Sequence, residues 1–190
     1  MKTVVMGLGY IGLPTAAVIA DKGVETLGVD VNPIVVDTIN AGKIHLVEPE
    51  LDTVVKRVVE RGQLKAVSKP EQGDVFLIVV PTPFRHNHRP DLSYIEAATR
   101  AVIPFLKEGN LYIIESTSPV GTTEKMAELI WKERPALKDK IYIAYCPERV
   151  LPGYPTSPNR RKSSSAPAKP TITNPTGAPK KRWQPAVILK

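Results

Sequence analysis

Three glycines near the N-terminus have the spacing of a loop that binds phosphate. Gly7, Gly9 and Gly12 form the pattern GxGxxG in residues 7–12, GLGYIG, a pattern typical of the turn from a first strand into a first helix. In such a loop Gly7 permits the tight turn, Gly9 lets a pyrophosphate approach the backbone, and Gly12 lets the helix pack on the sheet. The N–H groups at the start of that helix would then face the phosphates.

Asp30 is the acidic residue that such a loop needs to hold a dinucleotide. It follows the apolar run Thr26–Val29 and lies 18 residues past Gly12. A carboxylate there accepts hydrogen bonds from the adenosine ribose hydroxyls and repels a 2′-phosphate. No Lys or Arg occurs in the five residues after Asp30, which favours NAD over NADP. A flavin dinucleotide and a glycine turn that binds nothing are the alternatives.

Polar segments containing proline end three other apolar runs. They are VPTP at 80–83, ESTSPVG at 115–121 and YCPERVLPG at 145–153. Taken singly, each proline is an ordinary strand terminator. Because the carboxyl ends of parallel strands share one edge of the sheet, the three segments together predict a ligand crevice.

Alternating strands and helices must position these segments. The apolar runs predict strands at Thr3–Met6, Thr26–Val29, Leu64–Val67, Val75–Val80, Tyr112–Glu115 and Ile141–Ala144. Helices are predicted at Ile11–Lys22, Pro33–Ala41, Pro49–Arg61, Ser93–Lys107 and Thr122–Glu133. This alternation predicts an α/β fold, a Rossmann-type doubly wound parallel sheet.

Two helices carry further local signals. Asn32 precedes Pro33 and is a predicted N-cap. Ser93 and Glu96 have the spacing of a capping box. The apolar face predicted for the helix over residues 93–107 consists of Tyr94, Ala97, Ala98, Ala101, Val102 and Phe105.

Composition divides the chain after Gly153. Residues 154–190 hold eight of the 26 Lys and Arg residues and none of the 19 Asp and Glu residues, so residues 1–153 have a net charge of −1. The second segment also contains seven prolines, and it predicts a disordered basic tail. The net charge of +7 therefore belongs to the tail and is no argument for nucleic-acid binding by the domain at 1–153. No apolar run is long enough for a membrane span, and the single cysteine suits a cytoplasmic location.

Four motifs resemble the N-terminal NAD-binding domain of the UDP-glucose/GDP-mannose dehydrogenase family. They are GLGYIGLP at 7–14, VPTP at 80–83, ESTSPVG at 115–121 and CPERVLPG at 146–153. Glucose enzymes tend to carry PEFLREG where this chain has PERVLPG, so Pro152 replaces an acidic residue. Together with HLVEPEL at 45–51 and TPF at 82–84, this variant is more similar to the N-acetylmannosamine branch.

The resemblance implies an NAD-dependent oxidation of a UDP-sugar. The C6 alcohol becomes a carboxylate through a cysteine-bound intermediate, which gives a UDP-aminouronic acid for surface polysaccharide synthesis. By position, the family roles fall on the following residues: Tyr10 and Ile11 at the pyrophosphate, Asp30 at the ribose, Val35 near the adenine, Thr82 and Thr117 at the dinucleotide, Thr117 also at the hydrolytic water, Glu148 in acid–base work, and Arg149 and Val150 at the substrate. Full-length family members are expected to be homodimers.

The family's nucleophilic cysteine lies in a GGxCxxxD-like motif that this chain does not contain. Cys146 is interpreted as a small, semi-buried apolar residue instead. We expect a truncated or frameshifted product after Gly153, which binds NAD without turning over the sugar.

The alternative function is a non-catalytic NAD-binding module whose basic tail binds nucleic acid or an anionic partner. The tail has few aromatic residues for base stacking, so such binding would be weak and dependent on salt. His86 and His88 have no Cys or acidic residue beside them. This pattern favours a solvated loop over a metal site.

Overall fold

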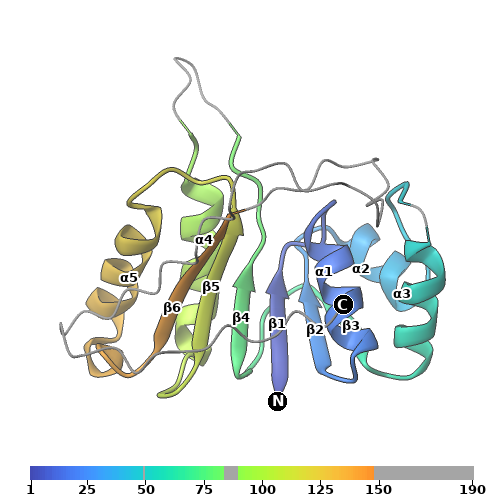
Figure 1. Ribbon diagram of the computed structural model, residues 1–190, viewed down its shortest axis with the longest axis horizontal. Coiled ribbons are helices and arrows are strands. Elements are labelled where there is room, and N and C mark those ends of the chain that lie inside the picture. The colour runs from blue at the N-terminus through green and yellow to red at the C-terminus, as the bar shows by residue number, and fades with distance from the viewer. Residues whose placement is uncertain (49, 84–89, 148–190) are drawn as a thin grey trace, which may run out of the picture.

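Six parallel strands form a single sheet in the order β3-β2-β1-β4-β5-β6 (Figure 1). The computed structural model describes residues 1–48, 50–83 and 90–147, and the predicted tail lies outside them. The strands are β1 Lys2–Met6, β2 Glu25–Val29, β3 Leu64–Val67, β4 Val75–Ile78, β5 Leu111–Ser116 and β6 Tyr142–Pro147. This order, with its reversal between β1 and β4, is that of a dinucleotide-binding Rossmann fold, and it confirms the predicted fold class.

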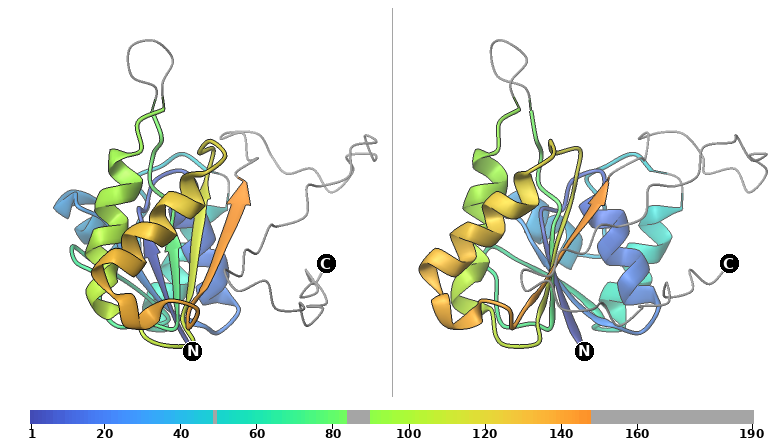
Figure 2. Two further views of the ribbon diagram at one scale, coloured as in Figure 1. Left: turned by 90° about the vertical axis from the view of Figure 1, so that its left-hand side faces the viewer. Right: turned by 60° about the vertical axis from the view of Figure 1, so that its left-hand side comes forward.

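Helices cover both faces of the sheet (Figures 1 and 2). They are α1 Gly12–Asp21, α2 Pro33–Asn40, α3 Leu51–Glu60, α4 Ser93–Val102 and α5 Thr122–Glu133, with the 3-10 turns η2 Ile103–Phe105 and η3 Pro135–Leu137. The predicted N-cap of α2 is confirmed, because Asn32 accepts a hydrogen bond from the N–H of Ile34 at 3.0 Å.

Strand alternation divides the apolar residues into two cores. On β1, Val4 and Met6 face the core beneath α4 and α5, whereas Val5 faces the core beneath α1, α2 and α3. Successive side chains of a strand point to opposite faces, so a strand buried on both sides reads as an unbroken apolar run. The sheet is therefore held rigidly from both faces, and its carboxyl edge can carry a precisely shaped site.

The predicted capping box on α4 is wrong. The N-cap residue is Leu92, which has no side chain that could cap, and neither Ser93 nor Glu96 makes a capping bond. Instead, the carboxylate of Asp91 accepts the N–H of Ser93 at 2.9 Å, and Glu96 forms an ion pair with Arg100 at 3.2 Å. Asp91, one position before the N-cap, thus accepts one of the backbone N–H groups that the first turn of α4 leaves unpaired.

The apolar face predicted for α4 is also displaced by one position. The side chains buried on this helix are those of Ile95, Ala98, Thr99 and Val102, whereas Tyr94 is 51% exposed. Thr99 tolerates burial because its hydroxyl donates to the Ile95 carbonyl at 2.7 Å and lies 2.6 Å from the hydroxyl of Tyr112 on β5. A polar residue with two partners is therefore part of the core, which apolar periodicity does not reveal.

One helix side chain covers the outer edge of β3. The amide of Asn40, the last residue of α2, donates to the carbonyl of Ala66 and accepts its N–H, both at 2.9 Å. These bonds satisfy the N–H and the carbonyl of Ala66 on an edge strand. They also fix the C-terminal end of α2, whose N-terminal end follows Asp30. Among residues 1–48, 50–83 and 90–147, no helix has both the length and the apolar character needed to cross a membrane.

Candidate cofactor and substrate site

The glycine loop between β1 and α1 is held at three points. The N–H of Gly7 donates to the Val29 carbonyl at 2.8 Å, and the N–H of Leu8 donates to the Asp30 carboxylate at 3.0 Å. The side chain of Leu8 is fully buried and fills the space above Gly28, where a Cβ would come within 2.7 Å of it. The sequence interpretation missed this contact, although a glycine inside a strand indicates a close approach.

The three glycines of the loop have different surroundings. Gly7 has a φ of +95°, and a Cβ there would lie 2.4 Å from the Val79 carbonyl oxygen. A Cβ on Gly12 would lie 1.9 Å from the Gly7 carbonyl oxygen. Gly9, by contrast, has nothing within 4 Å of its Cβ position. Two glycines therefore close the turn, and the third leaves open space beside the backbone.

The N-terminus of α1 suits an anion. No side chain of the described residues caps it, and its first turn contains no acidic residue. Unpaired N–H groups and the helix dipole make such an end electropositive. The open space at Gly9 adjoins this helix end in the sequence, so a pyrophosphate fits the site. Tyr10 lies beside it and is 52% exposed, and Ile11 is the N-cap residue of α1.

Asp30 ties the glycine loop to the start of α2. One carboxylate oxygen accepts the N–H of Leu8, and the other accepts the N–H of Asn32 at 2.9 Å. A carboxylate has about four acceptor positions, so Asp30 retains capacity for ribose hydroxyls. Its orientation is fixed before any ligand arrives.

Val35, predicted near the adenine, is almost wholly buried in the core beneath α1, α2 and α3. The exposed apolar side chains of this segment are Val31, which is 90% exposed, and Ile34, which is 72% exposed. They lie on either side of the Asn32 cap. Val35 therefore supports this segment from below, while Val31 and Ile34 form its surface.

Thr82 and Thr117 meet although 35 residues separate them. Thr82 follows β4, Thr117 follows β5, and their hydroxyl oxygens are 3.2 Å apart. Parallel pairing of β4 with β5 brings both strand ends to the same edge, as the strand-end motifs predict. The pair lies on the β4 side of the strand-order reversal, and Asp30 lies on the β2 side.

Several predicted site residues lie outside the described part of the chain: Glu148, Arg149, Val150, His86 and His88. Cys146 is described, and it is exposed, so its interpretation as semi-buried is wrong. It lies on β6, which among the described residues pairs with β5 alone, and fewer neighbours cover such an edge strand. In the described ranges, no three His, Cys, Asp or Glu side chains gather as a metal site would require.

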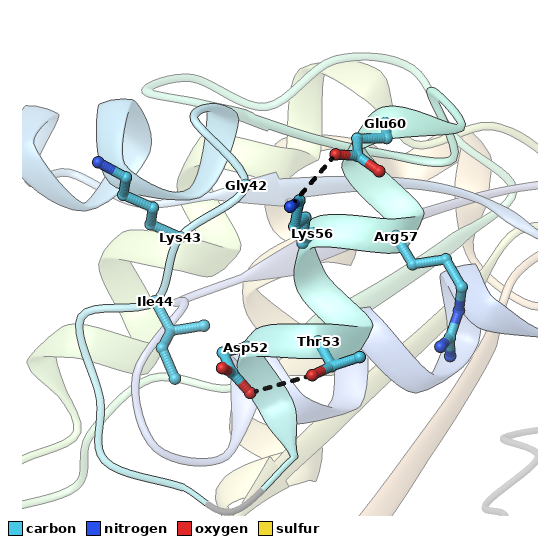
Figure 3. Close-up of a pocket in the computed structure, with 8 residues that line it drawn as sticks. All are labelled: Gly42, Lys43, Ile44, Asp52, Thr53, Lys56, Arg57 and Glu60. Atoms are coloured by element: carbon cyan, nitrogen blue, oxygen red, sulfur yellow. Dashed lines mark hydrogen bonds and ion pairs between the residues drawn. The ribbon is translucent and has the colours of Figure 1, made fainter.

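A separate hollow lies along α3 (Figure 3). It is open to solvent and contains none of the residues discussed above. Its lining residues are Gly42, Lys43, Ile44, Asp52, Thr53, Lys56, Arg57 and Glu60. Lys56 pairs with Glu60 at 4.0 Å, and Arg57 pairs with Asp21 at 2.8 Å. These local pairs account for much of its charge, and we assign it no ligand.

The chain belongs to the UDP-glucose/GDP-mannose dehydrogenase family. Residues 1–160 match the NAD binding domain of that family. The glycine loop, the uncapped helix end and Asp30 fit this cofactor. NAD is accordingly the cofactor of this domain, and when bound it would accept a hydride.

Within this family, the chain is similar to several dehydrogenases of N-acetylated amino-sugar nucleotides. The chain is 55% identical over 157 residues to the UDP-N-acetyl-D-mannosamine dehydrogenase of Yersinia pestis, covering 78% of this chain and 37% of the relative. It is 54% identical over 158 residues to the NDP-N-acetyl-D-galactosaminuronic acid dehydrogenase of Ralstonia nicotianae, covering 79% and 37%. The solved UDP-D-ManNAc dehydrogenase of Pyrococcus horikoshii superposes with a TM-score of 0.77 at 44% identity, covering 80% and 37%. The chain thus spans about 37% of the length of these relatives.

Proposed function

We propose that this chain is the NAD-binding part of a UDP-N-acetyl-D-mannosamine 6-dehydrogenase. The reaction would oxidise the C6 alcohol of the UDP-sugar to a carboxylate, consuming water and two NAD⁺. The observation that carries the proposal is the 55% identity to dehydrogenases of that name in Yersinia pestis, Campylobacter jejuni and Escherichia coli. We also propose that the complete enzyme is a cytoplasmic homodimer.

In this proposal each edge residue has a distinct task. Asp30 holds the adenosine ribose, and the loop at residues 7–12 holds the pyrophosphate. Thr82 and Thr117 hold the other half of the dinucleotide, and Thr117 also positions the hydrolytic water. Glu148 would move a proton during the hydrolytic step, because a carboxylate beside a water can act as a general base. Arg149 and Val150 would contact the sugar nucleotide.

A chimaera tests the proposal. Residues 1–160 of this chain would replace the matching part of the Yersinia pestis enzyme, and NADH formation would be followed with UDP-N-acetyl-D-mannosamine and NAD⁺. The parent enzyme is the positive control. We expect turnover with NAD⁺ and little with NADP⁺. A folded chimaera that binds NAD⁺ but oxidises no mannosamine substrate would refute the assignment of the sugar.

The 54% identity to the NDP-N-acetyl-D-galactosaminuronic acid dehydrogenase of Ralstonia nicotianae supports a nucleotide-linked N-acetylgalactosamine as a second candidate substrate. The same assay therefore includes UDP-N-acetyl-D-galactosamine. A second chimaera would be made with the Ralstonia nicotianae enzyme. If it oxidises UDP-N-acetyl-D-galactosamine while the Yersinia pestis chimaera does not oxidise UDP-N-acetyl-D-mannosamine, the galactosamine substrate replaces the mannosamine substrate in our proposal. A Glu148→Gln variant of the active chimaera should retain NAD⁺ binding and lose most turnover.

A further inference from the structure

The hydroxyl of Tyr145 reaches the two carbonyl groups that flank Thr117. Tyr145 lies on β6, where it pairs in register with Ile114 of β5. Its hydroxyl donates to the Ser116 carbonyl at 2.9 Å, and the Ser118 carbonyl is 3.3 Å away. One hydroxyl carries one proton, so the shorter bond is the principal one and the longer contact shares it. A single side chain thus ties both ends of the Thr117 peptide segment to the neighbouring strand.

The burial of this segment alternates from residue to residue. Ser116 and Ser118 are buried, at 5% and 8% exposure, whereas Thr117 between them is exposed. The N–H of Ser118 donates to the hydroxyl of Ser116 at 3.3 Å, which closes a small turn. With both flanking residues facing inward, Thr117 points away from the core. Its hydroxyl meets that of Thr82 there.

The position of this threonine pair indicates which half of the dinucleotide it serves. Asp30 follows β2, and the glycine loop follows β1, so the adenosine and the pyrophosphate occupy that side of the crevice. The strand order continues from β1 to β4 and β5. A dinucleotide crossing the reversal point therefore places its nicotinamide–ribose half over the ends of β4 and β5, where Thr82 and Thr117 lie.

We propose that Tyr145 is a positioning residue for the nicotinamide half of the cofactor, and that it acts by fixing the backbone on both sides of Thr117. It need not touch the cofactor itself. The proposal rests on NAD as the cofactor, and it is independent of which sugar the complete enzyme oxidises.

The Tyr145→Phe substitution removes the hydroxyl and leaves the ring in place. The matched control is Tyr142→Phe on the same strand, because Tyr142 is 58% exposed whereas Tyr145 is half-buried. Calorimetric titration of the full 190-residue chain would use two probes, NAD⁺ and ADP, since ADP contains only the adenosine and the phosphates. Thermal unfolding would be recorded for each variant.

We expect Tyr145→Phe to weaken NAD⁺ binding about three- to tenfold, the effect of losing one hydrogen bond, and to leave ADP binding unchanged. Tyr142→Phe should alter neither. Equal weakening of NAD⁺ and ADP binding would show a general structural role and overturn the proposal. Unchanged NAD⁺ affinity would overturn it too.

A double-mutant cycle tests the route through Thr117. If Tyr145 acts through that residue, Tyr145→Phe should cost little additional NAD⁺ affinity in a Thr117→Val background. Fully additive losses would contradict this route.

The ligand-free protein gives an independent measurement. Amide resonances of Thr117 and Thr82 should shift on Tyr145→Phe and remain in place on Tyr142→Phe. Unmoved resonances would overturn the positioning role even if NAD⁺ binding could not be measured. Failure of the unmutated chain to bind NAD⁺ would count against the cofactor assignment separately.

Discussion

At the scale of single residues, Gly9 and Gly12 differ in the space that a side chain would find. They belong to one hexapeptide, yet a Cβ on Gly9 would meet nothing within 4 Å, while a Cβ on Gly12 would meet the Gly7 carbonyl oxygen at 1.9 Å. We therefore expect Gly9 to matter for the ligand and Gly12 to matter for folding. Alanine at each position separates these requirements.

Gly12→Ala should destabilise the protein by about 3 kcal/mol or more, because the methyl group forces the backbone apart. Gly9→Ala should leave the unfolding midpoint within about 2 °C of the original and abolish most NAD⁺ binding. Urea unfolding for the free energy, thermal unfolding for the midpoint temperature and NAD⁺ titration of both variants measure this. The reverse pattern, a stable Gly12→Ala and an unstable Gly9→Ala, would contradict the loop geometry.

Asp30 shapes the site through two backbone hydrogen bonds, and we expect it also to select the cofactor. Asp30→Asn replaces one acceptor oxygen by a donor, so either Leu8 or Asn32 loses the partner of its N–H. We expect a stability loss of about 1–2 kcal/mol, about tenfold weaker NAD⁺ binding and reduced discrimination against NADP⁺. Parallel titrations with the two dinucleotides check this, and an unchanged affinity ratio would remove Asp30 from cofactor selection.

At the scale of secondary-structure elements, a buried hydrogen bond joins α4 to β5. Tyr112 is fully buried and lies 2.6 Å from Thr99, whose hydroxyl already donates to the Ile95 carbonyl. Burial raises the pKa of Tyr112 well above its usual value, and the hydrogen bond with Thr99 lowers it by less. The folded protein therefore keeps Tyr112 protonated at a pH where the unfolded chain ionises it.

This difference predicts a loss of stability in alkali. The unfolded tyrosine titrates near pH ~10, and the folded one titrates higher, so the stabilisation is complete below about pH 10 and is lost as the pH rises above that. Tyr112→Phe should be less stable than the parent at pH ~8 and should show a flatter decline above pH ~10. Urea midpoints across this range measure the slope. Parallel slopes in the two proteins would exclude Tyr112 as the cause.

How far the sequence predicts these elements depends on where the information lies. In the described part of the chain, the sequence predicts the six strands and five α-helices with ends within five residues of those observed, because apolar runs and strand terminators are local signals. The capping of α4 and its buried face were not, since they depend on Asp91, Thr99 and Tyr112 in the folded chain. In the site, the glycine spacing predicted the loop, but only tertiary structure brings Tyr145 beside the segment at Thr117.

At the scale of the whole molecule, cofactor binding is linked to folding, because the candidate site exists only when both halves of the sheet are folded. The candidate site contains residues that follow β1, β2, β4 and β5, so a ligand bound there would contact both halves of the sheet. A ligand that binds only the folded state stabilises it according to its concentration and affinity.

NAD⁺ at about 100 times its dissociation constant should therefore stabilise the full chain by about 2.7 kcal/mol. The same concentration of NADP⁺ should stabilise it much less, because the carboxylate of Asp30 repels the additional phosphate. Thermal unfolding with each dinucleotide gives the comparison. Equal shifts with both would contradict the selection of NAD.

The bonds between Asn40 and Ala66 have a consequence for association between molecules. An exposed edge strand presents backbone donors and acceptors that can recruit a strand from another copy and begin aggregation. At Ala66 both groups are already occupied by a side chain from α2. The helix that follows Asp30 thus also occupies the edge of β3 at Ala66, so we expect a variant that loosens α2 to aggregate more readily through this strand.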